Sequence, residues 1–166
     1  MIALDEQLLS YGVQVSIARW YRGAVTDITQ LRPHTVILDD AIPLLLRAAP
    51  RPTFVTINVT DFWQRLAPNP RFCIVCCAVP HTRAHEVPDL LRRVLALEQF
   101  RTRSHRLGKI VRVSPQHVQY YTTDHELYTS LPGTKHCDSS RGHGREKMFD
   151  IQAGGNTIRG SRSSGR

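Results

Sequence analysis

Residues 53–62 read Thr-Phe-Val-Thr-Ile-Asn-Val-Thr-Asp-Phe, and the expected architecture follows outward from this stretch. Its first half, residues 53–57, is β-branched and apolar, which predicts a strand inside a sheet. Asn58 and Asp61 then close the run. Ligands of α/β proteins bind outside the carboxyl ends of the strands, so polar residues directly after a strand are candidate site residues.

Two more acidic clusters stand beside apolar runs. Asp5 closes residues 2–4, and the pair Asp39-Asp40 follows residues 35–38 and precedes a helical pattern. Carboxylates gathered at one sheet edge repel one another unless a cation lies between them, and hard oxygen ligands suit Mg²⁺ or Mn²⁺. The alternative interpretation is that Asp39 or Asp40 caps a helix and Asp61 caps a turn.

Strand-like and helix-like patterns alternate along the chain. This alternation predicts βαβ units and a mainly parallel sheet. We therefore expect one α/β domain of three layers, α/β/α, over residues 1–122. The predicted strands cover residues 2–4, 25–28, 53–57, 71–79, 110–113 and 118–122, the last two as a hairpin, and the predicted helices cover residues 6–22, 42–48 and 87–97.

Length and charge narrow the class of protein. The chain has 166 residues, 41% of them hydrophobic, and a formal net charge of +8. Such a balance favours an anionic partner, of which nucleic acid is the commonest. No run reaches the ~18 apolar residues of a membrane span, and the first residues lack a basic secretory leader. We expect a cytoplasmic protein without membrane contact.

The last part of the chain differs in composition. Residues 132–166 hold seven Lys or Arg and three Asp or Glu, a balance of +4, and Gly, Ser and Arg dominate the last dozen. Such a segment cannot build a core, so residues 123–166 are expected to form a flexible basic tail. It either grips phosphate as an unstructured arm or extends the chain without a function.

Three of the four cysteines lie close together. Cys73 and Cys76 have the spacing of a zinc knuckle, but they stand inside a continuous apolar run with Cys77. Side chains three apart on a strand point to opposite faces, so buried free thiols are the expectation. A zinc-stabilised binding module is the weaker alternative, with His136, Cys137 and His143 as the possible second ligand pair.

The order of these motifs resembles that of the PIN-like nuclease domains, and within them a short subgroup related to the toxin ribonucleases of toxin–antitoxin pairs. Leu4-Asp5-Glu6 is similar to the subgroup's strand ending in Leu-Asp-Glu. Asp39-Asp40 leading into a helix and Ile57-Asn58-Val59-Thr60-Asp61-Phe62 resemble its other two motifs. The likeness covers residues 1–122. Val59 stands where the subgroup usually has an aspartate.

The resemblance implies metal-dependent cleavage of a phosphodiester, usually in RNA. By motif position, the catalytic residues would be Asp5, Asp39, Asp40 and Asp61, with Asp5, Asp40 and Asp61 as ligands of Mg²⁺ or Mn²⁺. Such an ion polarises the phosphate and lowers the pKa of a bound water. Glu6, Thr56 and Asn58 would orient the metal ligands without contacting the ion themselves.

The resemblance also implies partners. Four arginines are candidate contacts for the nucleic-acid backbone, although the alternative for each is a solvated helix face: Arg83, Arg92, Arg93 and Arg106. An antitoxin protein and a homodimer are further possible partners. The valine at position 59 supports the alternative function, a catalytically inactive PIN-like protein that binds RNA or a partner protein.

Overall fold

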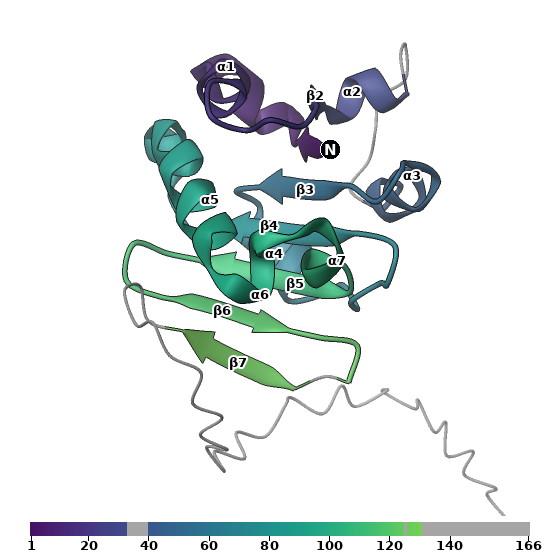
Figure 1. Ribbon diagram of the computed structural model, residues 1–166. Helices are drawn as coiled ribbons and strands as arrows, with labels where there is room; N and C mark the ends of the chain where they lie inside the picture. The colour runs from purple at the N-terminus through teal and green to yellow at the C-terminus, as the bar shows by residue number, and fades with distance from the viewer. Residues whose placement is uncertain (33–39, 125, 131–166) are drawn as a thin grey trace, which may run out of the picture. The chain divides into compact units, whose positions relative to one another are not determined.

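The computed structural model describes residues 1–32, 40–124 and 126–130. Among these residues, seven strands form one sheet in the order β2-β1-β3-β4-β5-β6-β7 (Figure 1). The first five strands in that order pair in parallel, and β6 and β7 pair antiparallel to their neighbours. The expected α/β class with a mainly parallel sheet is therefore confirmed. The strands are β1 (Ile2–Leu4), β2 (Val25–Asp27), β3 (Thr53–Thr56), β4 (Cys73–Cys77), β5 (Lys109–Val113), β6 (Val118–Tyr121) and β7 (Leu127–Ser130).

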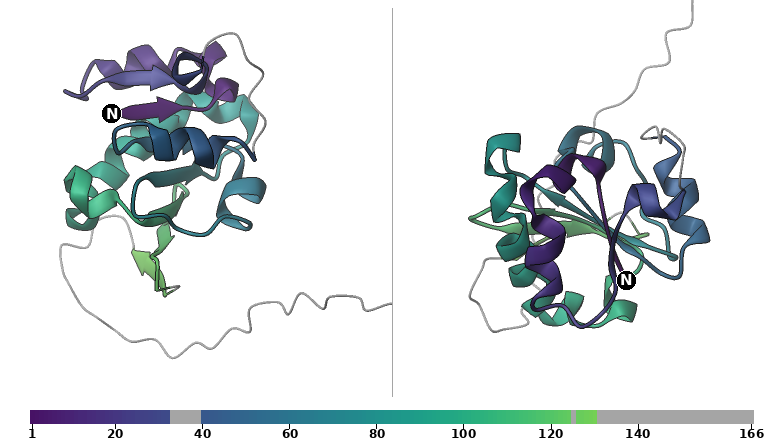
Figure 2. Two further views of the ribbon diagram at one scale, coloured as in Figure 1. Left: turned by 90° about the vertical axis from the view of Figure 1, so that its right-hand side faces the viewer. Right: turned by 90° about the horizontal axis from the view of Figure 1, so that it is seen from above.

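Helices cover both faces of the sheet (Figure 2). Successive residues of a strand point to opposite faces. On β3, Val55 packs with Leu8 and Leu91 on one face, while Phe54 packs with Phe62 on the other. The helices are η1 (Glu6–Tyr11), α1 (Val13–Ala18), α2 (Ile28–Leu31), α3 (Ile42–Ala48), α4 (Val59–Trp63), η2 (His81–Glu86), α5 (Val87–Ala96), α6 (Glu98–Arg101) and α7 (Arg103–Arg106). In the described part of the chain, none is both long and apolar enough for a membrane span.

The helix expected over residues 6–22 is interrupted. Gly12 has φ +62°, a left-handed conformation that glycine adopts without steric cost. The chain therefore forms the 3-10 helix η1 before Gly12 and the α-helix α1 after it. The expected helices over 42–48 and 87–97 match α3 and α5 closely, and Pro43 and Pro88 lie in their first turns, where a missing N–H costs nothing.

The sheet continues past residue 122, where the predicted domain ends. Strand β7 pairs with β6, from Leu127 opposite Tyr121 to Ser130 opposite Val118. Leu127–Ser130 has four residues, fewer than the window over which an alternating strand pattern is visible in a sequence. The rest of the predicted tail lies outside the described residues.

The cysteines of β4 are buried on both faces of the sheet. Cys73 and Cys77 belong to the core cluster under α5, whereas Cys76 belongs to the cluster on the opposite face. These side chains cannot share one metal ion, so the zinc-knuckle alternative is wrong for Cys73 and Cys76. Burial raises the pKa of Cys73 and of Cys77 to about 12, and it raises the pKa of Cys76 as well.

Core packing under α5 predicts the effect of a truncation. Leu91 is fully buried, so Leu91→Ala should lower the free energy of unfolding by ~2–5 kcal/mol through reduced burial and a residual cavity. Leu44→Ala is the matched control, because Leu44 is 64% exposed and its replacement should change stability by less than ~0.5 kcal/mol. Urea denaturation of both variants measures the difference. Equal losses would contradict the described packing.

Burial of the thiols predicts their reactivity. In a Cys137→Ser variant, the three thiols of β4 should react with a disulfide reagent at pH 8 only as the protein unfolds, because the thiolate is the nucleophile and burial suppresses it. The measurement is the release of the chromophore over time, with and without denaturing urea. Prompt reaction of the native protein would show that β4 is accessible.

Candidate functional site at the carboxyl edge of the sheet

Strand order reverses at β1, and this reversal marks the candidate site. From β1 the chain passes to β2 on one side and then returns to β3 on the other. In open α/β sheets the ligand crevice opens at such a reversal, outside the carboxyl ends of the strands. Asp5 follows β1 directly, and Thr56 is the last residue of the neighbouring strand β3.

Asp5 is held by backbone and side chain together. Its N–H donates to the carbonyl of Val55 at 2.9 Å, which continues the pairing of β1 with β3 by one residue. The hydroxyl of Thr56 donates to Oδ2 of Asp5, and the same hydroxyl oxygen accepts the N–H of Asn58 at 2.9 Å. Asp5 is 3% exposed and Thr56 is fully buried. The carboxylate is therefore fixed in place at an apolar sheet edge.

Asp61 is held by the start of helix α4. The side chain of Asn58 accepts the N–H of Asp61 at 3.2 Å and donates to Oδ2 of Asp61 at 2.8 Å. This reciprocal arrangement resembles a capping box, with Asn58 as the N-cap. Asp5, Thr56, Asn58 and Asp61 thus form one continuous chain of hydrogen bonds, which we call the edge network.

Arg65 completes the surroundings of Asp61. Its Nη1 lies 2.8 Å from Oδ1 of Asp61, one helical turn further along the chain, and the arginine side chain is 71% exposed. The i,i+4 spacing of an acid and a base is the signal in the sequence from which this pair could have been predicted. Both oxygens of Asp61 therefore have donors in the structure.

The other expected acids lie apart from the edge network or outside the described residues. Asp40 is exposed in the turn before α3, and Ala41, with no side-chain bond, is the N-cap of that helix, so the capping interpretation is wrong for Asp40. Glu6 is exposed in the first turn of η1. Asp39 lies outside the described residues.

A metal site of three acids is not formed by the residues that are described. Over residues 1–32, 40–124 and 126–130, no three His, Cys, Asp or Glu side chains gather closely enough to hold an ion together. Asp5, Asp40 and Asp61 are therefore not brought together as one group. The carboxylates that the edge network does connect are Asp5 and Asp61.

Asp27 is a buried acid at this edge that sequence reasoning missed. It ends β2 in register with Leu4, the residue before Asp5, and it is 5% exposed. Its Oδ1 accepts the hydroxyl of Thr29 and, at 3.1 Å, the N–H of Gln30, so it caps α2. The signal in the sequence is an aspartate three residues before a glutamine, which is typical of a helix start.

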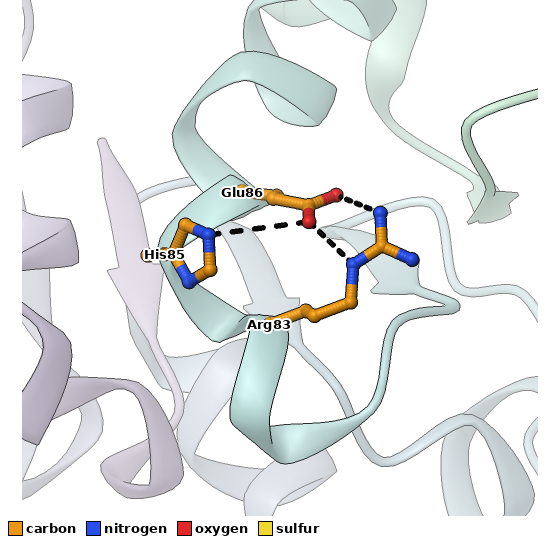
Figure 3. Close-up of polar contacts among 3 residues, drawn as sticks. All are labelled: Arg83, His85 and Glu86. Atoms are coloured by element: carbon orange, nitrogen blue, oxygen red, sulfur yellow. Dashed lines mark hydrogen bonds and ion pairs between the residues drawn. The ribbon is translucent and has the colours of Figure 1, made fainter.

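Arg83 forms an ion pair on the surface of η2. Its Nε and Nη2 lie 2.5 and 2.8 Å from the two oxygens of Glu86, and His85 lies 4.0 Å from the same carboxylate (Figure 3). This contact raises the pKa of Arg83 and lowers the pKa of Glu86. A phosphate group would therefore have to compete with the Glu86 carboxylate for the Arg83 guanidinium.

The remaining three candidate arginines have different surroundings. Arg92 is exposed and lies over the ring of Trp20 at 5.9 Å, and Arg93 donates to the carbonyl of Pro115 at 3.0 Å. Arg106 is 5% exposed and donates to the Thr53 hydroxyl and to the carbonyl of Phe100. The expected RNA contact of Arg106 is therefore wrong, because its guanidinium is buried and already donates hydrogen bonds to groups inside the protein.

Comparisons with models of known protein families, with curated proteins and with solved structures found no match to this chain. The class of protein therefore rests on the fold and on the edge network.

The edge network predicts a stability cost for one substitution. Thr56→Val keeps the shape of the buried side chain but removes the hydroxyl between Asp5 and Asn58, so the free energy of unfolding should fall by ~1–3 kcal/mol. Thr60→Val is the matched control on the exposed side of α4 and should change it by less than ~0.5 kcal/mol. Urea denaturation separates the two, and equal values would mean that the network adds no stability.

Proposed function

We propose that this chain is a divalent-metal-dependent ribonuclease of PIN-like type, built on a three-layer α/β/α domain. The observation that supports the proposal is the edge network. It connects Asp5 and Asp61, from two of the three resembling motifs, at the reversal of strand order. The links are the Thr56 hydroxyl and the backbone N–H and side chain of Asn58.

The side chains of the edge network offer oxygen ligands, the type that Mg²⁺ and Mn²⁺ prefer. Mg²⁺ usually keeps several waters and takes one or two carboxylates together with the phosphates of a substrate, so Asp5 and Asp61 are a sufficient protein contribution. Asp39 and Asp40 remain candidates for a further contact. When bound, the ion supplies charge to polarise the scissile phosphate and lowers the pKa of a coordinated water.

The protein's own part is to orient and to protect the carboxylates. Thr56 donates to Oδ2 of Asp5 and so fixes the rotation of that carboxylate at the sheet edge. Asn58 fixes Oδ2 of Asp61 and anchors the first turn of α4. Supporting contacts of this kind change metal affinity by ~10–100-fold when they are removed.

Arg65 would have two roles in this proposal. It neutralises Asp61 while no substrate is bound, and an exposed pair of this kind contributes only ~0–1 kcal/mol. The guanidinium can therefore turn from the carboxylate to a phosphate oxygen at little cost, and its planar fork suits that group. Arg92 and Arg93 remain candidate contacts for the RNA backbone, and so does Arg83 if it leaves Glu86.

A catalytically inactive PIN-like protein that binds RNA or a partner protein is the second candidate. Three observations favour it: the valine at position 59, the Arg65 pair on Asp61, and the lack of a three-acid group among the described residues. A role as the toxin of a toxin–antitoxin pair belongs to the ribonuclease proposal, as do a homodimeric state and a cytoplasmic location. A small antitoxin-like protein in the neighbouring reading frame would support that role.

Calorimetric titration with Mg²⁺ and Mn²⁺, together with cleavage of labelled RNA, tests the proposal. Binding and metal-dependent cleavage should both be abolished in Asp5→Asn and Asp61→Asn, because each change removes a ligand charge while keeping the side-chain shape. Asp89→Asn is the control, since Asp89 is an exposed acid of α5. Urea denaturation of each variant confirms that it is folded.

The outcomes separate the two candidate functions. Metal binding and cleavage that depend on Asp5 and Asp61 support the nuclease. RNA binding without either metal binding or cleavage supports the inactive protein. Cleavage that persists in both aspartate variants would show that the edge network is not the active site.

A further inference from the structure

A hollow of about 580 Å³ lies at the opposite edge of the sheet from the edge network. Its walls come from the segments that lead into the amino-terminal ends of neighbouring strands. Arg51 stands two residues before β3, and Arg71 stands two residues before β4. Arg47, from the last turn of α3, contributes the third charged wall.

The three arginines are exposed and carry uncompensated charge. Within the part of the chain that the structure describes, none of them forms an ion pair, and no Asp or Glu lines the hollow. Burial, followed by the charges of Arg103 and Arg106, lowers the pKa of the amino group of Met1.

Arg51 has an unfavourable backbone conformation. Its φ of +52° lies in the left-handed region, and it is the one non-glycine residue with positive φ in the described chain. Glycine adopts this conformation without a steric penalty, whereas a residue with a Cβ does not. Pro50 and Pro52 flank it and restrict the turn. An arginine here is a poor choice for folding alone, so its guanidinium is the feature that needs an explanation.

We infer that this hollow binds the phosphate backbone of a single-stranded RNA. Guanidinium groups match phosphate oxygens with pairs of parallel hydrogen bonds, and the Ser104 hydroxyl in the same wall adds a further donor. The lining contains no aromatic ring for stacking on a base and no carboxylate or amide side chain for its edge. The site therefore recognises the backbone and not the sequence.

The inference rests on the proposed function only in the choice of RNA as the polyanion. Binding at the hollow needs neither metal ion nor cleavage. It can therefore be measured in EDTA, where a failure of the nuclease proposal has no influence on the result.

The experiment uses the full chain and a fluorescein-labelled oligouridine, with affinity measured by fluorescence anisotropy over a range of salt concentrations. Arg47→Gln/Arg71→Gln should weaken binding at least about tenfold at low salt. It should also make the slope of log K against log salt shallower by about 1.4, or ~0.7 for each phosphate that is no longer neutralised. Arg19→Gln/Arg22→Gln is the matched control, with the same change of net charge from +8 to +6 on exposed residues after α1. The control should keep the wild-type slope.

Arg51→Gly separates binding from folding. Glycine suits φ +52°, so the urea midpoint should not fall, whereas affinity for the oligouridine should. A variant that is as stable as the wild type and binds RNA more weakly supports the site. A variant with unchanged affinity overturns a binding role for Arg51.

Three further results would overturn the inference: no binding of oligouridine by the wild type, equal losses of affinity in the Arg47/Arg71 and Arg19/Arg22 variants, or no loss in either. Binding to phosphatidylserine vesicles is measured in parallel, because a lipid surface is the alternative partner for the hollow. Binding to vesicles but not to RNA, abolished in Arg47→Gln/Arg71→Gln, would assign the hollow to a lipid surface instead. Because the measurement is made in EDTA, binding of oligouridine at the hollow should persist even if no metal-dependent cleavage is found.

Discussion

The pairing of β1 with β3 under helices on both faces is the constraint on which the arrangement of polar groups depends. Phe54 and Val55 of β3 are fully buried on opposite faces, as are Ala3 and Leu4 of β1. Burying a polar side chain without a hydrogen-bond partner costs ~1–3 kcal/mol by mutational measures. Such side chains are therefore disfavoured inside a strand that is buried on both faces. On β1 and β3 the charged side chains are therefore found at the two ends of the strands, whereas β5 carries Arg112 within the strand.

At the carboxyl edge, packing and site geometry are mutually dependent. A buried carboxylate such as Asp5 is tolerated because donors satisfy it, and Thr56 can donate only while β1 and β3 stay in register. Helix α4 has five residues, too few to be stable alone, so it depends on Asn58 as its cap and on the burial of Phe62. The same amide that starts the helix orients Asp61. A change in the local fold therefore displaces the candidate ligands together.

Sequence patterns predicted those parts that local chemistry determines. The apolar runs located β1, β3 and β4, and the polar residues that end the first two, Asp5 and Asn58, lie at the carboxyl edge as expected. Contacts between residues far apart in the sequence could not be predicted from these local patterns. Arg106 resembles any basic surface residue in sequence, yet it reaches Thr53 and is buried. Short elements were missed for a related reason: α2, α6 and α7 have four residues each, less than the window over which a helical period is visible.

The two edges of the sheet carry opposite charge, and this separation has a physical consequence. Asp5, Asp27 and Asp61 lie at the carboxyl edge, whereas Arg47, Arg51 and Arg71 surround the hollow at the other. A strand of four residues such as β3 spans about 13 Å at ~3.3 Å per residue. This separation is longer than the ~8 Å over which the field of exposed charges, such as those of the three arginines, is screened at physiological ionic strength. The arginines can therefore attract a polyanion without forming ion pairs with the carboxylates at the other end of the strands. One small sheet can thus hold an anion site and a candidate cation site with little mutual cancellation, provided that they stand at opposite ends of its strands.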